Sequence, residues 1–91
     1  MSDRQFGELL EVATGHLKAL VSEKALAKGL ANDIAELHED IRRMEAEVSA
    51  IVDPNSTSAT VKAALQTLGT WAWHTSDHLK NIHAILEEEY D

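Results

Sequence analysis

Two histidines and an aspartate near the C-terminus have the spacing of metal ligands. His74, Asp77 and His78 are spaced i, i+3 and i+4, so a helix would place their side chains on one face. Two imidazoles at i and i+4 can bind one metal ion, and the carboxylate can supply a third ligand. The competing interpretation puts His78 at the edge of the core and His74 at the surface. No Glu-x-x-His or His-Glu-x-x-His motif occurs, which argues against a di-iron or zinc-protease site.

Two tryptophans lie next to these histidines in the sequence. Trp71 and Trp73 would point about 200° apart on a helix, so both cannot face one core. Trp71 continues an apolar stripe, whereas Trp73 falls among polar residues. An exposed Trp is a common anchor of protein interfaces. We therefore expect Trp73, with Trp71 and His74 beside it, to contact either a second copy of the chain or another protein, unless an oligomer surrounds the helix there.

Acidic residues dominate the charge of the chain. Sixteen Asp and Glu against eight Lys and Arg give a formal charge of −8, which argues against binding nucleic acid through its phosphates. The charge is compatible with solubility, with a basic protein partner or with imitation of nucleic acid. Carboxylates on the polar side of residues 33–52 are interpreted as an outer, solvated face: Asp33, Glu36, Glu39, Asp40 and Glu47. Within this face we expect Glu36, Glu39 and Asp40 to contact a basic partner.

Apolar periodicity predicts the helices that carry these residues. Within residues 34–51 the apolar positions recur every 3.5 residues on average, as in bundles and coiled coils: Ile34, Leu37, Ile41, Met44, Val48 and Ile51. The predicted helices span residues 3–28, 33–52 and 58–89, and Pro54 separates the last two. A capping box from Ser2 to Gln5 and a contact between Met1 and Phe6 would start the first helix. The break after the first helix is favoured at Gly29–Asn32; a break at Val21–Ser22 and no break are the alternatives.

The size of the chain favours self-assembly. Ninety-one residues form one small domain, 1–91, and without cysteine no disulfide can stabilise it. The third helix would be about 48 Å long and the second about 30 Å, so the first helix or a second subunit must cover the excess. Like charges at Asp40 and Glu45 disfavour a parallel dimer through the second helix, which leaves the third as the expected interface. The acidic residues 87–91 are expected to fray or to meet a cation such as Lys28, Arg42 or Arg43 of a neighbouring chain.

These features predict an all-α protein: an antiparallel three-helix bundle with a long C-terminal helix, completed by oligomerisation, with a homodimer as the first expectation. No leader peptide or membrane span is visible, so a cytoplasmic location is expected. The predicted function is that of a small, acidic, non-enzymatic regulatory protein that binds another protein, comparable to phage or bacterial inhibitors and antiactivators. No cofactor, nucleic-acid or membrane partner is predicted. The alternative is an oligomeric bundle that binds a metal or small ligand at the subunit interface through His74, Asp77 and His78.

Overall fold

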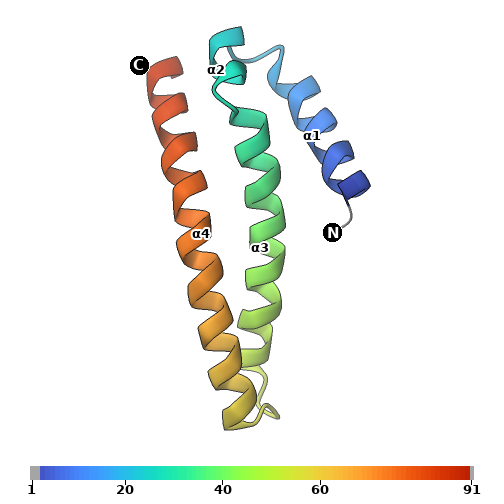
Figure 1. Ribbon diagram of the computed structural model, residues 1–91, viewed down its shortest axis with the longest axis vertical. Helices are drawn as coiled ribbons and strands as arrows, with labels where there is room; N and C mark the ends of the chain where they lie inside the picture. The colour runs from blue at the N-terminus through green and yellow to red at the C-terminus, as the bar shows by residue number, and fades with distance from the viewer. Residues whose placement is uncertain (1–2, 91) are drawn as a thin grey trace.

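Four helices account for most of residues 3–90, which the computed structural model of the protein describes. They are α1 (Asp3–Leu17), α2 (Glu23–Ala27), α3 (Leu30–Val52) and α4 (Ser58–Tyr90). The long helices α3 and α4 form an antiparallel hairpin, and α1 packs on the side of α3 away from α4 (Figure 1). The all-α prediction is confirmed, with one more helix than expected. Met1 and Ser2, the predicted staple and capping residues, lie outside the described residues.

The first predicted helix, 3–28, is interrupted in the structure. Helix α1 ends at Leu17, and the backbone N–H of Val21 donates to the Leu17 carbonyl oxygen at 2.9 Å. Ser22 then caps α2, because its hydroxyl oxygen accepts a hydrogen bond from the Ala25 N–H at 3.2 Å. The break at Val21–Ser22, which the sequence had offered as an alternative, is therefore present.

The favoured break at Gly29 is present as well. Gly29 has φ 91° and ψ 22°, a left-handed conformation that costs a residue with a Cβ about 1–2 kcal/mol. Its N–H donates to the Leu26 carbonyl oxygen at 3.0 Å, which closes the end of α2. Helix α3 begins directly after it at Leu30, three residues before the predicted start. The two breaks create the short helix α2 between α1 and α3.

The turn between α3 and α4 follows the prediction closely. Asp53 accepts a hydrogen bond from the Asn55 N–H at 2.9 Å, and the Ser56 hydroxyl donates to the Ala50 carbonyl oxygen at 2.7 Å. The Thr57 hydroxyl oxygen accepts from the Thr60 N–H at 3.2 Å at the start of α4. These bonds satisfy backbone groups at the ends of both helices, so the hairpin turn is well defined.

Helix α2 covers the end of α4 that extends beyond α3. Helix α4 has 33 residues and α3 has 23, a difference of about 15 Å in length. Ala25, Leu30 and Ile85 form the buried centre of the core there. The half-buried apolar residues packed around it are Leu17, Val21, Ile34, Ile82 and Leu86. Because α2 belongs to the predicted first helix, 3–28, the first of the two alternatives is confirmed: residues of that segment, now a separate short helix, cover this end of α4.

Polar contacts with α2 also hold the acidic C-terminus of α4. Lys24 and Lys28 both pair with the Glu88 carboxylate, and the hydrogen bond from Lys24 is the main reason that the pKa of Glu88 falls to about 2. The Ser22 N–H and hydroxyl donate to the two oxygens of Glu89 at 2.6 and 2.8 Å. The lysine expected from a neighbouring chain is thus supplied by the same chain.

Helix α3 is rotated relative to the orientation that its apolar pattern predicted. Asp33 and Asp40 face α4 and are 7% and 1% exposed, whereas Ile41 and Val48 remain about half exposed. One residue position, about 100° around the helix, separates the two faces. The interpretation of Asp33 and Asp40 as outer, solvated residues is therefore wrong. Their burial is tolerated because imidazoles on α4 provide hydrogen-bonding partners.

Candidate functional site

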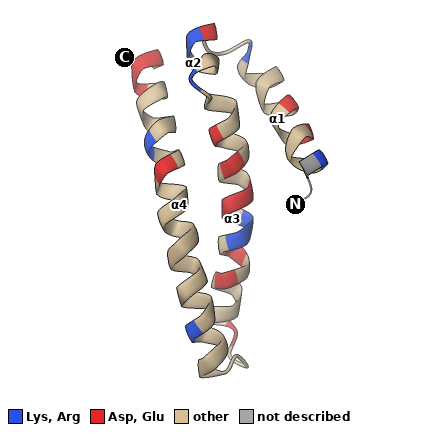
Figure 2. Cartoon of the chain, viewed as in Figure 1, with Lys and Arg blue, Asp and Glu red and all other residues tan. Residues whose placement is uncertain are grey.

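Three carboxylates of α3 meet two imidazoles and a hydroxyl of α4 on one side of the hairpin. We call this group the histidine–carboxylate cluster; its members are Asp33, Glu36, Asp40, His74, Thr75 and His78. The turn at residues 53–57 joins the two helices, and the partners on α4 lie one to five residues farther from it along the chain than those on α3. Charged side chains gather on α3, whereas the middle of α4 carries hardly any (Figure 2).

Asp40 is the most deeply buried member of the cluster. One of its oxygens lies 2.9 Å from His74 Nδ1 and accepts a hydrogen bond from the Thr75 hydroxyl at 3.2 Å. Thr75 is buried as well, while the His74 ring is partly open to solvent. Asp40, on the buried side of the His74 ring, therefore determines the orientation of that ring.

His78 has a carboxylate next to each ring nitrogen. Its Nδ1 lies 2.9 Å from Asp33 Oδ1, and its Nε2 lies 3.5 Å from Glu36 Oε2. An ionised carboxylate only accepts hydrogen bonds, so the short contact with Asp33 places a proton on Nδ1. In the neutral ring, Nε2 then presents a lone pair toward the Glu36 carboxylate. Two electron-rich atoms facing each other attract a proton or a cation between them.

Arg43 and Trp71 border the cluster toward the hairpin turn. The Arg43 guanidinium lies 4.3 Å from the centre of the Trp71 ring and hydrogen-bonds Glu39 at 2.5 Å. The Trp71 ring meets the His74 ring edge-on, with 5.7 Å between ring centres. His74 meets His78 in the same manner at 5.1 Å. Aromatic packing thus limits the movement of both imidazoles.

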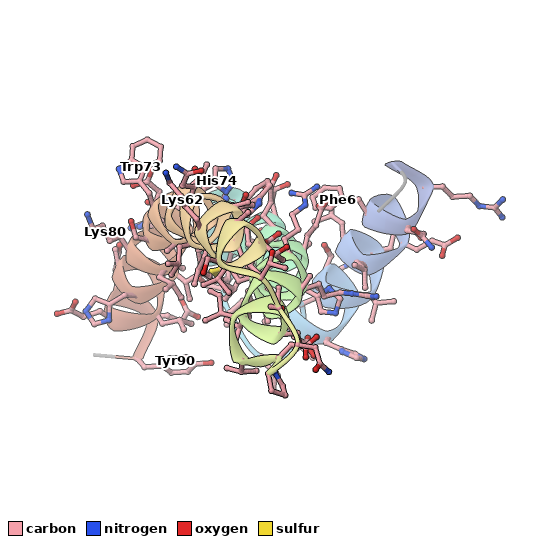
Figure 3. All side chains as sticks on the ribbon, turned by 90° about the horizontal axis from the view of Figure 1, so that it is seen from below. Phe6, Lys62, Trp73, His74, Lys80 and Tyr90 are labelled. Carbon is pink, nitrogen blue, oxygen red and sulfur yellow. The ribbon has the colours of Figure 1, made fainter. Side chains whose placement is uncertain are left out.

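Most residues predicted to bind a partner are used in contacts within the chain. Five of them lie in the cluster or border it: Glu36, Glu39, Asp40, Trp71 and His74. Asp40, at 1% exposed, presents no surface to a partner. Trp73 differs, since it is 72% exposed and points away from α3 (Figure 3). Its expected role as an interface anchor stays a prediction.

The structure groups the predicted metal ligands differently. His74 and His78 come together, but Asp77 is exposed, and Glu36 of α3 is the carboxylate that joins them. One ligand atom each from Glu36, His74 and His78 lie within 4.8 Å of one another. Spacing along one helix could not identify Glu36, because the contact crosses between helices. The sequence did contain one signal that these carboxylates face the other helix. Asp33 and Asp40 are seven residues apart, which is the spacing of two core positions on one helix face.

The opposite side of the hairpin is apolar and uncovered. We call it the apolar side; it consists of Ile41 and Val48 of α3 with Leu65, Ala72 and Leu79 of α4. The four larger side chains are 44–54% exposed. In each helix, the residue that follows a position facing the other helix points about 100° away from it. Because the two helices are antiparallel, this turn leads to the same side of the pair in both, so these residues lie together. The hairpin therefore has one polar and one apolar side.

Helix α1 leaves an open groove beside α3. The groove has a volume of about 710 Å³ and is lined by Leu9 and Val12 of α1 and by His38, Arg42 and Arg43 of α3, among others. The N-terminal half of α1 diverges from the hairpin here (Figure 1). The mixed lining has no buried polar group aimed into the groove that would select a ligand.

Comparison with protein-family models, with curated proteins and with solved structures finds no match to this chain. Within residues 3–90, no helix combines the length and the apolar character that crossing a membrane requires.

Proposed function

We propose that this protein is a non-enzymatic helical interaction protein that dimerises through the apolar side of its hairpin and binds a protein partner with a basic surface. The observation that carries the proposal is the uncovered apolar side, formed by Ile41, Val48, Leu65 and Leu79. Singly exposed apolar residues are common, but a row of them along two adjacent helices is typical of an interface.

A second copy of the chain fits this surface for two reasons. The residues of the apolar side include no charged side chain. Two chains of formal charge −8 could therefore meet there without bringing like-charged side chains of this surface into contact. Two antiparallel hairpins stacked face to face also make a four-helix bundle, a stable arrangement of helices that each have one apolar stripe. The expected dimer interface therefore includes both α3 and α4, and not α4 alone.

The partner would meet the parts of the surface that the dimer leaves open. Trp73 lies on the outer edge of α4, on the same side as His74 (Figure 3), and it supplies a large exposed ring. The net negative charge favours association with a basic surface and would make that association weaken with salt. Trp73 with the exposed acidic residues is the surface that we propose for the partner.

Sedimentation velocity tests the dimer. The wild-type protein is expected to sediment as a dimer at micromolar concentration, and the double variant Ile41→Glu, Leu79→Glu as a folded monomer. Val12→Glu is the matched control, because Val12 is 57% exposed but lies on α1. A wild-type monomer, or a dimer that survives the double substitution, would contradict the proposal.

Trp73→Ala separates the two interfaces. This variant should remain a dimer, and it should lose the salt-sensitive association with a basic partner isolated from the native cell. Loss of the dimer in Trp73→Ala, with an intact dimer in Ile41→Glu, Leu79→Glu, would assign self-assembly to the opposite side of the hairpin.

A further inference from the structure

We propose that Glu36, His74 and His78 form a binding site within a single chain for one divalent transition-metal ion of the Zn²⁺ type. The site goes beyond the proposed interaction function and lies on the opposite side of the hairpin from the apolar side. It also differs from the site predicted from sequence, because Glu36 replaces Asp77 and no second subunit is needed.

The free ring nitrogens are the first argument for a metal. Nδ1 of His74 and Nδ1 of His78 each lie 2.9 Å from an aspartate oxygen, which leaves Nε2 of each ring to coordinate. At His78 this free nitrogen already faces a carboxylate oxygen of Glu36 at 3.5 Å. A metal ion placed between them would form a coordinate bond with each of these two atoms.

Buried carboxylates behind the histidines are the second argument. Metal-binding histidines almost always donate their other N–H to a carboxylate, a carbonyl or water, which fixes the ring and raises its basicity. Here both histidines have such a carboxylate, Asp40 for His74 and Asp33 for His78, and both aspartates are buried. Asp33 and Asp40 would be positioning residues that do not touch the metal.

The distances fit a small ion with modest adjustment. In a tetrahedral zinc site with bonds of about 2.0 Å, neighbouring ligand atoms are about 3.3 Å apart. The contact between His78 and Glu36 is already close to this value at 3.5 Å. One ligand atom from each of the three residues lies within 4.8 Å of the other two, so a change of up to about 1.5 Å would complete the set. Glu36 and His74 are both partly exposed, and their side chains have room to make that change.

The charge of the cluster also favours a cation. Asp33, Glu36 and Asp40 bring three carboxylates into a small volume. Among the ion pairs of the described residues, Arg43 is the one Arg or Lys that reaches them, at 4.0 Å from Asp40. Two imidazoles and one carboxylate are a ligand set found in zinc sites, with water at the remaining position. These ligands select a transition metal over Mg²⁺ or Ca²⁺, which prefer oxygen ligands.

Titration of untagged, metal-free protein with Zn²⁺ in a calorimeter tests the site, with Co²⁺ absorption as a second readout of coordination. One Zn²⁺ per chain is expected. His78→Ala and Glu36→Gln should each weaken binding at least tenfold. Asp33→Asn and Asp40→Asn should weaken it about 10–100-fold and shift the Co²⁺ spectrum.

Two controls locate the ligands. His83→Ala removes an exposed histidine of the same helix that pairs with Glu87 at 3.2 Å, and Asp77→Asn removes the ligand predicted from sequence. Both should bind Zn²⁺ as the wild type does. Should circular dichroism show that His78→Ala is unfolded, Glu36→Gln decides, because it keeps the size of a half-exposed side chain.

The monomeric variant Ile41→Glu, Leu79→Glu distinguishes this proposal from the proposed function. It should still bind one Zn²⁺ per chain, so a failure of the dimer would leave the metal site standing. Absence of saturable Zn²⁺ binding in the wild type, equal binding by Glu36→Gln, or loss of binding in Asp77→Asn would overturn the site. Loss of binding in the monomeric variant would overturn its assignment to a single chain.

Discussion

Asp40→Ala is expected to lower the free energy of unfolding by about 2 kcal/mol. The substitution removes an acceptor that serves His74 and Thr75 at 2.9 and 3.2 Å, and a hydrogen bond to a charged group contributes about 1.5–3 kcal/mol. We take the lower half of this range for two reasons. The His74 side chain is 43% exposed and can turn to water, and the Thr75 hydroxyl can donate instead to a carbonyl one turn back. For a domain of this size, 2 kcal/mol corresponds to a decrease of roughly 8–16 °C in Tm.

A double-mutant cycle isolates the contact between Asp40 and His74. Urea unfolding of wild type, Asp40→Ala, His74→Ala and the double variant, followed by circular dichroism, should give a coupling energy of about 1–2 kcal/mol. All four proteins are compared with a chelator present and at one protein concentration, so that neither metal nor assembly contributes. Glu45→Ala, an exposed acidic residue of the same helix, should stay within about 0.5 kcal/mol of wild type. An unfolding free energy unchanged in Asp40→Ala, or no coupling in the cycle, would refute the buried pair.

Two further predictions concern the junctions around α2. Because Lys24 and Lys28 lower the pKa of Glu88 from 4.5 to about 2, their stabilisation is complete above pH 4.5 and is lost as the pH falls toward 2. Melting temperatures of wild type and Glu88→Gln should therefore differ at pH 6 and converge near pH 2, and curves that remain parallel would count against these ion pairs. Gly29→Ala should cost about 1–2 kcal/mol in urea unfolding, because φ is 91° and no neighbouring atom crowds the new Cβ. Gly15→Ala in α1 should instead stabilise by up to about 1 kcal/mol, and equal effects at both glycines would refute the left-handed turn.

The helices could be predicted from the sequence because their signals are local. Pro54 and the capping residues around it identified the hairpin turn, and the start of α4 at Ser58 was predicted correctly. The glycine turn at Gly29 was recognised too, since a left-handed position favours glycine. The cap at Ser22 was considered as an alternative to Gly29, and the structure uses both. A single local signal could not indicate that two breaks lie seven residues apart.

The orientation of α3 could not be predicted from its own residues. Its apolar seam suggested that Ile41 and Val48 face the core, while the structure turns Asp33 and Asp40 toward α4. The choice between these two orientations of α3 depends on His74 and His78, which lie more than 30 residues away and supply hydrogen-bonding partners for the buried carboxylates. Periodicity along one helix carries no information about partners on another. Pairing residues by equal distance from the 53–57 turn places Asp40 opposite Thr70, one helical turn from His74, so the turn alone does not identify the contact either.

The rotation of α3 links the two proposals. Turning the carboxylates inward pairs them with histidines, and the same turn moves Ile41 and Val48 onto the side where Leu65 and Leu79 also emerge. If the cluster holds a metal ion, the ion joins α3 to α4 and would fix this rotation. Metal binding should then favour the dimer without any contact between the ion and the interface, through the shared orientation of one helix. The sedimentation of the wild type with and without Zn²⁺ would show this coupling. The variant Glu36→Gln, which leaves the apolar side unchanged, would not respond to the ion.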